Sequence, residues 1–173
     1  MEKLLEVANN KNFKIFLNTK WLLKNSMKNN MNASDIIVKI MAIEDYFGKN
    51  NYGMNMYNKM QKIRVLQNKL IEIEKANNQE NFADLIESFK KNGFNDKYPV
   101  ELNKKFEIFE GSHRLACSIY FGIEEIPVTF NKNFWELTYD YSLKWFENNG
   151  MAEYIPFIKD KYNKIFMECR EWN

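Results

Sequence analysis

The residues whose types and order could do chemistry lie in one short stretch, Glu110-Gly111-Ser112-His113-Arg114. Gly111 tolerates positive φ and close approach of a ligand, and Ser112 can cap a helix whose first amides form an anion site. Arg114 offers a planar fork of donors to phosphate oxygens, and His113, the only histidine in the chain, can donate a hydrogen bond or add charge. The stretch therefore predicts a phosphate-binding turn. Each residue also has a purely structural explanation. Gly111-Ser112 could simply start a helix, His113 could be a structural histidine, and Arg114 could pair with Glu110.

The elements that must position this turn are predicted to be a strand hairpin before it and a helix after it. Residues 98–102 and 106–109 have strand composition and flank a short polar turn. After the turn, apolar residues between positions 115 and 120 recur with helical spacing, and Gly122 ends the helix.

Two further strands are predicted. Residues 35–43 form an apolar run rich in β-branched side chains, which favours a buried strand. Residues 123–130 also have strand composition, and Pro127 within them suits an edge strand better than a central one.

Helices are predicted for most of the remaining chain. Residues 1–30 indicate two short helices or one interrupted helix, residues 54–75 one long amphipathic helix, and residues 82–89 a second that stops at Asn92-Gly93. The aromatic-rich residues 134–171 also have helical spacing, with breaks near Gly150 and at Pro156.

The composition excludes several classes of protein. With 173 residues and 45% hydrophobic content, the chain can bury one core, so we expect a single domain over residues 1–173. A net charge of +2 argues against nucleic acid as a partner. Cys117 and Cys169 are too far apart for a redox pair and too few for a zinc cluster, so both are expected to be small buried hydrophobes. No apolar run is long enough to cross a membrane and the first residues do not resemble a signal peptide, so a cytoplasmic protein is expected.

Residues 82–128 resemble the ParB/sulfiredoxin superfamily. The resemblance covers the order of the elements, and its specific part is the string EGSHRLA followed by FGIEEIPV. It implies an α+β fold with a small mixed sheet over a core of about residues 34–130. Helical extensions at residues 1–33 and 131–173 would pack on that core.

The branches of this superfamily imply different chemistries. Sulfiredoxins have a cysteine at the position of Ser112, and a hydroxyl without an adjacent base is a much weaker nucleophile, so sulfinic acid repair is not expected. Partitioning ParB proteins add a basic recognition helix that residues 131–173 do not resemble. A nuclease would need metal-binding carboxylates, and no metal-ligand set can be assembled.

The free serine kinases of the superfamily have an acidic residue where this chain has Glu110. The resemblance implies that Glu110 orients or deprotonates an acceptor hydroxyl while residues 111–114 hold the phosphates of ATP or ADP, with Mg²⁺ as an accompanying ion. A further glutamate acts as base in those kinases, and Glu44 or Glu80 could take that part.

A weaker resemblance concerns uncharacterised superfamily members linked to surface-polysaccharide synthesis. It implies that Lys39, Tyr57 and Arg64 line the site and bind an anionic substrate or nucleotide. An edge charge for Lys39 and a solvated helix face for the other two are equally consistent with the pattern.

The residues and the resemblance are consistent with three functions. The first is a nucleotide-dependent phosphotransferase acting on a small hydroxylated molecule such as serine, and the second is a non-catalytic nucleotide-binding regulatory module. A ParB-like DNA-binding protein is a third alternative, against which the weak net charge counts.

Overall fold

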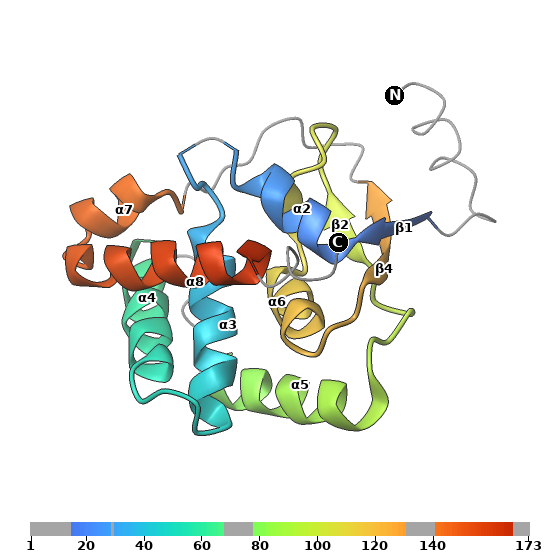
Figure 1. The fold of residues 1–173 in the computed structure, drawn as a ribbon, viewed down its shortest axis with the longest axis horizontal. Coiled ribbons are helices and arrows are strands. Elements are labelled where there is room, and N and C mark those ends of the chain that lie inside the picture. The colour runs from blue at the N-terminus through green and yellow to red at the C-terminus, as the bar shows by residue number, and fades with distance from the viewer. Residues whose placement is uncertain (1–14, 29, 68–77, 131–140, 168–173) are drawn as a thin grey trace.

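The fold combines helices with one four-stranded sheet, which is the α+β class predicted from the sequence (Figure 1). The computed structural model describes residues 15–28, 30–67, 78–130 and 141–167, with the side chains of residues 78–80 excepted. In chain order the elements are β1 (Ile15–Asn18), α2 (Thr19–Ser26), α3 (Ser34–Tyr46), α4 (Gly53–Gln67), α5 (Asn78–Asn92), β2 (Val100–Leu102), β3 (Ile108–Glu110), α6 (Ser112–Tyr120), β4 (Glu125–Phe130), α7 (Leu143–Asn148), a 3₁₀ turn (Ala152–Tyr154) and α8 (Ile155–Met167).

The sheet confirms the predicted hairpin and adds a strand that the sequence did not indicate. Strands follow the order β1-β4-β2-β3, with β2 and β3 antiparallel, β2 and β4 parallel, and β1 antiparallel to β4. Ile15–Asn18 is therefore a strand within the segment for which helices were expected, and α2 follows it directly. Residues 1–14 of that prediction lie outside the described part of the chain.

The edge position predicted for the strand with Pro127 is wrong, because β4 lies between β1 and β2. Pro127 is opposite Phe16 of β1, whereas parallel pairing with β2 begins only at Val128. Pro127 thus precedes the part of β4 that is paired on both sides, which explains how a central strand accommodates a residue without a backbone donor.

The strand predicted for residues 35–43 is also wrong, because these residues belong to α3. All ten residues from Ser34 to Ile43 are buried. Figure 1 shows α3 at the centre of the molecule, and it contacts α4, α6 and α8. A helix enclosed on all sides is apolar around its whole circumference, so it lacks the amphipathic period that identifies a surface helix. Burial of Ile36, Ile37, Val38 and Ile40 overrides the small intrinsic cost of β-branched residues in a helix.

The remaining predicted helices agree with the structure over the described residues. The helix expected at 54–75 is α4, whose part beyond Gln67 lies outside the description, and the helix at 82–89 is α5. In the C-terminal segment the chain turns at Asn149 and Gly150, but Pro156 lies in the first turn of α8 and does not break it. Proline is compatible with the first turn because its missing N–H has no intrahelical partner there. Of the predicted helical segment 134–171, residues 134–140 and 168–171 lie outside the described part.

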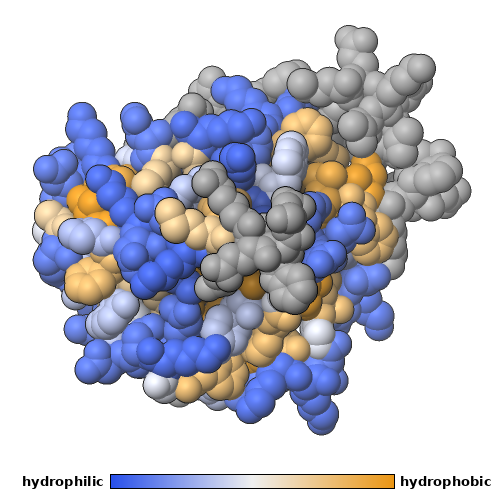
Figure 2. Space-filling view, viewed as in Figure 1, coloured by the Kyte–Doolittle hydropathy of each residue, from blue (hydrophilic) through white to orange (hydrophobic). Residues whose placement is uncertain are grey.

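On the face of the molecule in Figure 2, many hydrophilic residues surround areas of exposed hydrophobic residues. No helix among the described residues has both the length and the apolar character that a membrane span requires. Cys117 is fully buried in α6, as predicted, and burial raises the pKa of its thiol to about 12, whereas Cys169 lies outside the described residues.

Gly53, the first residue of α4, lies against the backbone of α3, and replacing it with alanine is expected to destabilise the protein by about 3 kcal/mol. A Cβ at this position would lie 2.0 Å from the carbonyl oxygen of Met41, a backbone atom that cannot move without shifting α3. The free energy of unfolding from urea titration measures the effect. Gly122→Ala is the control, because its Cβ would meet nothing within 4 Å and only its positive φ of 71° adds strain. Equal losses for the two variants would contradict the close helix contact as the cause.

Candidate functional site

A pocket of about 400 Å³ lies where three helices begin. Its wall includes Asp35 near the start of α3, Phe82 near the start of α5, and Ser112 to Arg114 in the first turn of α6. Arg64, close to the end of α4, completes the wall on another side. Helix N-termini carry partial positive charge and outward-pointing amides, so their convergence with arginine side chains favours an anion.

The turn into α6 has the backbone geometry that the sequence predicted. Gly111 has φ +96° and ψ 20°, in the left-handed region that glycine adopts most readily. It is also the N-cap of α6, and no side chain caps the helix. The expectation that Ser112 would cap this helix is therefore wrong, because Ser112 is the first helical residue and its hydroxyl has another partner. The first amides of α6 remain without intrahelical partners on the pocket side.

That partner of Ser112 is Lys39, a fully buried side chain of α3. Lys39 Nζ donates hydrogen bonds to the Asp35 carboxylate, one helical turn earlier, and to Ser112 Oγ at 2.7 Å. Burial lowers the pKa of Lys39 to about 8, with Arg64 acting in the same direction and Asp35 opposing it. The structure thus places Lys39 directly behind the turn and excludes the alternative of an edge charge.

His113 is held in the same region by a second buried residue, Tyr57 of α4. Tyr57 Oη and His113 Nε2 share a hydrogen bond of 2.9 Å, and Phe82 packs edge-on against the imidazole with a centroid distance of 4.8 Å. Tyr57 is 1% exposed, so the alternative of a solvated helix face is wrong for it. Burial raises the pKa of Tyr57 to about 12.

The surroundings of His113 favour the neutral form of its imidazole. Burial lowers its pKa well below the ordinary value, and the nearby cations Lys39, Arg64 and Arg114 lower it further. At this site His113 therefore acts as a hydrogen-bonding group that is oriented by Tyr57, and the positive charge comes from its neighbours.

The depressed pKa of His113 predicts a pH dependence of stability. Between the folded-state pKa and about 6.5 the unfolded chain binds a proton that the folded chain does not, so stability is complete above pH 6.5 and falls by up to about 1.4 kcal/mol per pH unit below it. Urea unfolding of the wild type and of His113→Gln between pH 5.5 and 7.5 measures the slope. Because the chain has one histidine, the variant should show a much flatter profile. Identical slopes for the two proteins would contradict a lowered pKa of His113 in the folded protein.

Arg114 and Arg64 are the cations that line the pocket itself. Arg114 Nη2 donates to the carbonyl of Pro99 at 3.1 Å and lies 3.8 Å from a carboxylate oxygen of Glu110. Arg64 lies over the ring of Tyr141, 4.6 Å from its centroid. Within the described part of the chain no carboxylate forms an ion pair with Arg64, and the Nε atoms of both arginines are buried without a hydrogen-bond partner. Each guanidinium group therefore has one donor, its Nε, that no described protein group accepts and that has no contact with solvent in this structure.

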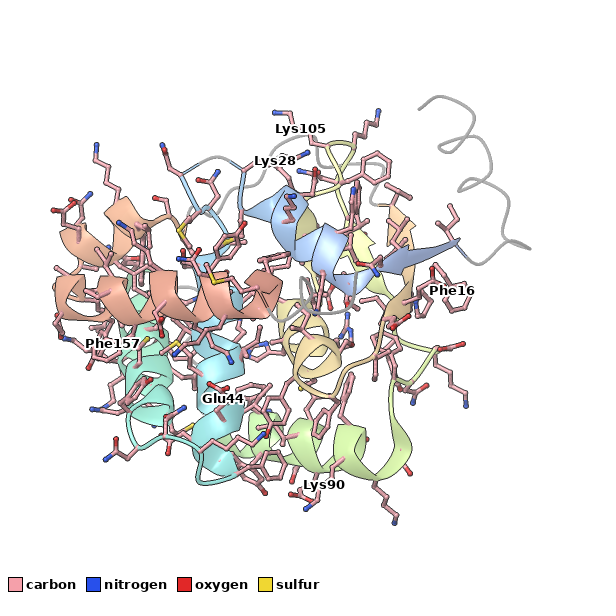
Figure 3. The ribbon with its side chains drawn as sticks, in the orientation of Figure 1. Phe16, Lys28, Glu44, Lys90, Lys105 and Phe157 are labelled. Carbon is pink, nitrogen blue, oxygen red and sulfur yellow. The ribbon has the colours of Figure 1, made fainter. Side chains whose placement is uncertain are left out.

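The three glutamates proposed as catalytic are placed differently. Glu110 lines the pocket at the end of β3, with 67% of its side chain exposed, so it can move toward a ligand or away from it. Glu44 lies toward the other end of α3 (Figure 3), where it pairs with Lys161 of α8 at 2.6 Å. Nine residues separate Glu44 from Asp35, about 13 Å along a helix, so the structure does not bring Glu44 to the pocket. Glu80 lies in α5, and its side chain is outside the described part.

Several pocket residues were missed by sequence reasoning. Asp35 was read as part of a strand, and its spacing of four residues from Lys39 becomes a signal only once the segment is recognised as a helix. Phe82 and Tyr141 supply an aromatic wall, and no local pattern connects either of them with the turn. Ser26 also lines the pocket, and its Oγ is buried without a hydrogen-bond partner in the described residues.

A magnesium ion would have to be held mainly by the phosphates of a nucleotide. Among the described residues no cluster of three His, Cys, Asp or Glu side chains could hold a metal ion. Mg²⁺ in phosphate-transfer sites is commonly held by one or two carboxylates together with substrate phosphates and water.

Comparisons with known proteins identify no relative. No protein-family model matches this chain, and no curated protein or solved structure matches it.

Proposed function

We propose that this chain is a nucleotide-binding phosphotransferase that moves a phosphoryl group from ATP or ADP to a small hydroxylated molecule such as serine. One observation carries the proposal. Arg64 and Arg114 line the same pocket as the uncapped first turn of α6, and both guanidinium groups have unused donors. Phosphate oxygens match this set of donors in charge and geometry.

The charges of the pocket support a ligand with more than one negative charge. Lys39 is balanced by Asp35, and Glu110 lies within ion-pair distance of Arg114, whereas Arg64 has only an aromatic ring for a partner among the described residues. A polyphosphate would displace Glu110 from Arg114 and would engage both arginines. The volume of about 400 Å³ is within the range of small-molecule sites.

In this proposal Glu110 is the base of the transfer. The acceptor oxygen forms a bond to the terminal phosphorus and its proton passes to the Glu110 carboxylate. The bond from that phosphorus to the rest of the nucleotide breaks, so ATP leaves as the diphosphate and ADP as the monophosphate. Arg114 and Arg64 stabilise the negative charge that is shared among the phosphoryl oxygens in the transition state.

We also propose membership of the ParB/sulfiredoxin superfamily, in line with the resemblance of residues 82–128. The observed succession of helix, antiparallel hairpin, glycine turn, helix and strand from α5 to β4 supports this assignment. Membership of the superfamily implies an activity like that of the free serine kinases only if Glu110 deprotonates the acceptor hydroxyl.

A non-catalytic nucleotide-binding module is the second candidate. It is favoured by the pairing of both pocket carboxylates in this structure, Asp35 with Lys39 and Glu110 with Arg114. In such a module Glu110 would act as a latch that is released from Arg114 when phosphate binds.

Titration calorimetry with ATP, ADP and CTP, followed by phosphorus NMR with a panel of small alcohols, tests the proposal. We expect binding of at least one nucleotide and the appearance of a phosphate monoester signal from one acceptor. Glu110→Gln should preserve binding and lower turnover by about 100-fold or more. Nucleotide binding without phosphoryl transfer to any acceptor would refute the phosphotransferase and support the regulatory module. Absence of nucleotide binding would refute both functions.

A further inference from the structure

The hydroxyl of Ser112 occupies an unusual position for a serine in this chain. It lines the pocket at the first residue of α6, next to the free amides of that helix and two residues before Arg114. Its Oγ contacts the amine of Lys39 at 2.7 Å, and Lys39 is fully buried. A hydroxyl needs an adjacent base to become a useful nucleophile, and the structure provides one that was not apparent from the sequence.

We propose that Ser112 is a nucleophile toward phosphorus, that Lys39 accepts its proton, and that phosphoryl transfer in this pocket proceeds through a covalent phosphoserine at Ser112. This inference rests on the proposed function, because it takes phosphoryl donors as the ligands of the pocket. It replaces the single displacement described above with two: Ser112 first takes the phosphoryl group from the nucleotide, and Glu110 then acts in the second step, on the acceptor.

Phosphoryl transfer through Ser112 takes two displacement steps. Ser112 Oγ forms a bond to the terminal phosphorus of a nucleoside triphosphate, the proton of the hydroxyl passes to the neutral amine of Lys39, and the nucleoside diphosphate leaves. An acceptor hydroxyl then attacks the phosphoserine phosphorus and gives its proton to Glu110. Ser112 Oγ departs and takes back its proton from Lys39.

The surroundings of Lys39 allow its amine to lose a proton near neutral pH. Burial and the positive charge of Arg64 bring its pKa to about 8, although Asp35 acts in the opposite direction. The charged and titratable groups around it are Asp35 on its own helix, Tyr57 and Arg64 on α4, and His113 and Arg114 on α6. Lys161 of α8 is engaged with Glu44 at the far end of α3.

The geometry also provides for the charge that develops on phosphorus. The amides in the first turn of α6 point outward beside Ser112, and no side chain caps them. Arg114 adds a guanidinium group from the same turn, with an unused Nε donor. These groups would stabilise the oxygens of the transferring phosphoryl group, as preorganised donors do in other transfer sites.

An alkyl fluorophosphonate tests the nucleophile directly, because attack by a serine Oγ expels fluoride and leaves a stable phosphonyl ester. The full chain is incubated with this probe, and adducts are located by peptide mass spectrometry. We expect one adduct, on Ser112, and none in Ser112→Ala. Ser26 is an internal comparison, because it lines the same pocket and has no lysine partner. No adduct on Ser112, or equal labelling of Ser26, would overturn the proposal.

The role of Lys39 is tested by the rate of labelling. The double variant Asp35→Asn/Lys39→Met removes the base without leaving an unpaired buried charge. Its labelling rate should fall by at least about 100-fold. Lys59→Met is the matched control, since Lys59 is an exposed lysine that pairs with Glu153, and it should react like the wild type. In the wild type the rate should rise with pH and level off above about pH 8. An undiminished rate in the double variant, or a rate that rises with hydroxide without levelling, would contradict proton transfer to Lys39.

A nucleotide arm separates this inference from the function on which it rests. ATP at millimolar concentration should protect Ser112 from the probe and, without an acceptor, should add one phosphoryl group to Ser112. Labelling by the probe without protection by ATP, ADP or CTP would refute nucleotide binding and leave the nucleophile established. Protection without any phosphoserine would refute the covalent step and leave the binding site established.

Discussion

Replacing Lys39 with methionine is expected to lower the free energy of unfolding by about 3 to 5 kcal/mol. Lys39 is fully buried and Asp35 is 6% exposed, so the variant leaves a carboxylate in a poorly solvated position without its cation. Removing one partner of a buried ion pair is costly because the remaining charge keeps its desolvation penalty. Urea unfolding followed by tryptophan fluorescence gives the difference.

The double variant Asp35→Asn/Lys39→Met is the matched control for this prediction. It removes both charges together, so most of the lost stability should return. The exposed pair of Lys59 and Glu153 provides a second comparison, since Lys59→Met should change stability by about 1 kcal/mol or less. If Lys39→Met were as mild as Lys59→Met, or if the double variant were no more stable than the single one, the ion pair of Lys39 and Asp35 could not be a buried pair.

Replacing Arg114 with alanine is expected to weaken nucleotide binding by about 10- to 100-fold, which corresponds to the loss of one charge-assisted interaction. Arg64→Ala should have an effect of similar size, because its guanidinium lines the pocket without a carboxylate partner among the described residues. Calorimetric titration with the tightest-binding nucleotide measures both effects. Binding should also weaken as salt concentration rises, since the contacts are ionic.

Two controls keep this prediction specific. Lys164→Ala removes an exposed cation that pairs with Asp160 on α8, so it lowers the net charge equally and should leave binding unchanged. Because Arg114 also donates to the carbonyl of Pro99, circular dichroism must show that Arg114→Ala is folded. Arg64 provides an independent variant if it is not. Unchanged affinity in both arginine variants would remove the phosphate site.

The hairpin, the glycine turn and α6 could be predicted because short-range rules determine them. Strand composition on both sides of a short polar turn specifies β2 and β3, which five residues separate in the structure. The positive φ of Gly111 is a local requirement of the turn into α6. Helix α6 could be predicted for a similar reason, because the apolar residues between positions 115 and 120 recur with the spacing of one helix face. The order of these elements sufficed to identify Arg114 and Ser112 as pocket residues.

Prediction failed where distant contacts outweigh local preference. In isolation the β-branched residues of 35–43 favour a strand, but α4, α6 and α8 enclose them and make a fully buried helix the better structure. The same error concealed the pairing of Asp35 with Lys39, which requires helical geometry. Pro127 was assigned to an edge because the sequence does not reveal β1, which pairs with β4 across more than a hundred residues.

The turn at Glu110 to Arg114 was thus specified by the sequence alone, since its glycine, its helix start and its arginine act within a few residues of one another. Only the tertiary structure decided what surrounds the turn. Lys39 is 73 residues from Ser112 and Tyr57 is 56 residues from His113, and nothing in a linear pattern relates them. Both pairs of residues meet because α3 and α4 pack with α6 in one core. Burial of the apolar surface of α3 also buries Lys39, and a buried amine needs hydrogen-bond partners. Among the described residues these partners are Asp35 and Ser112.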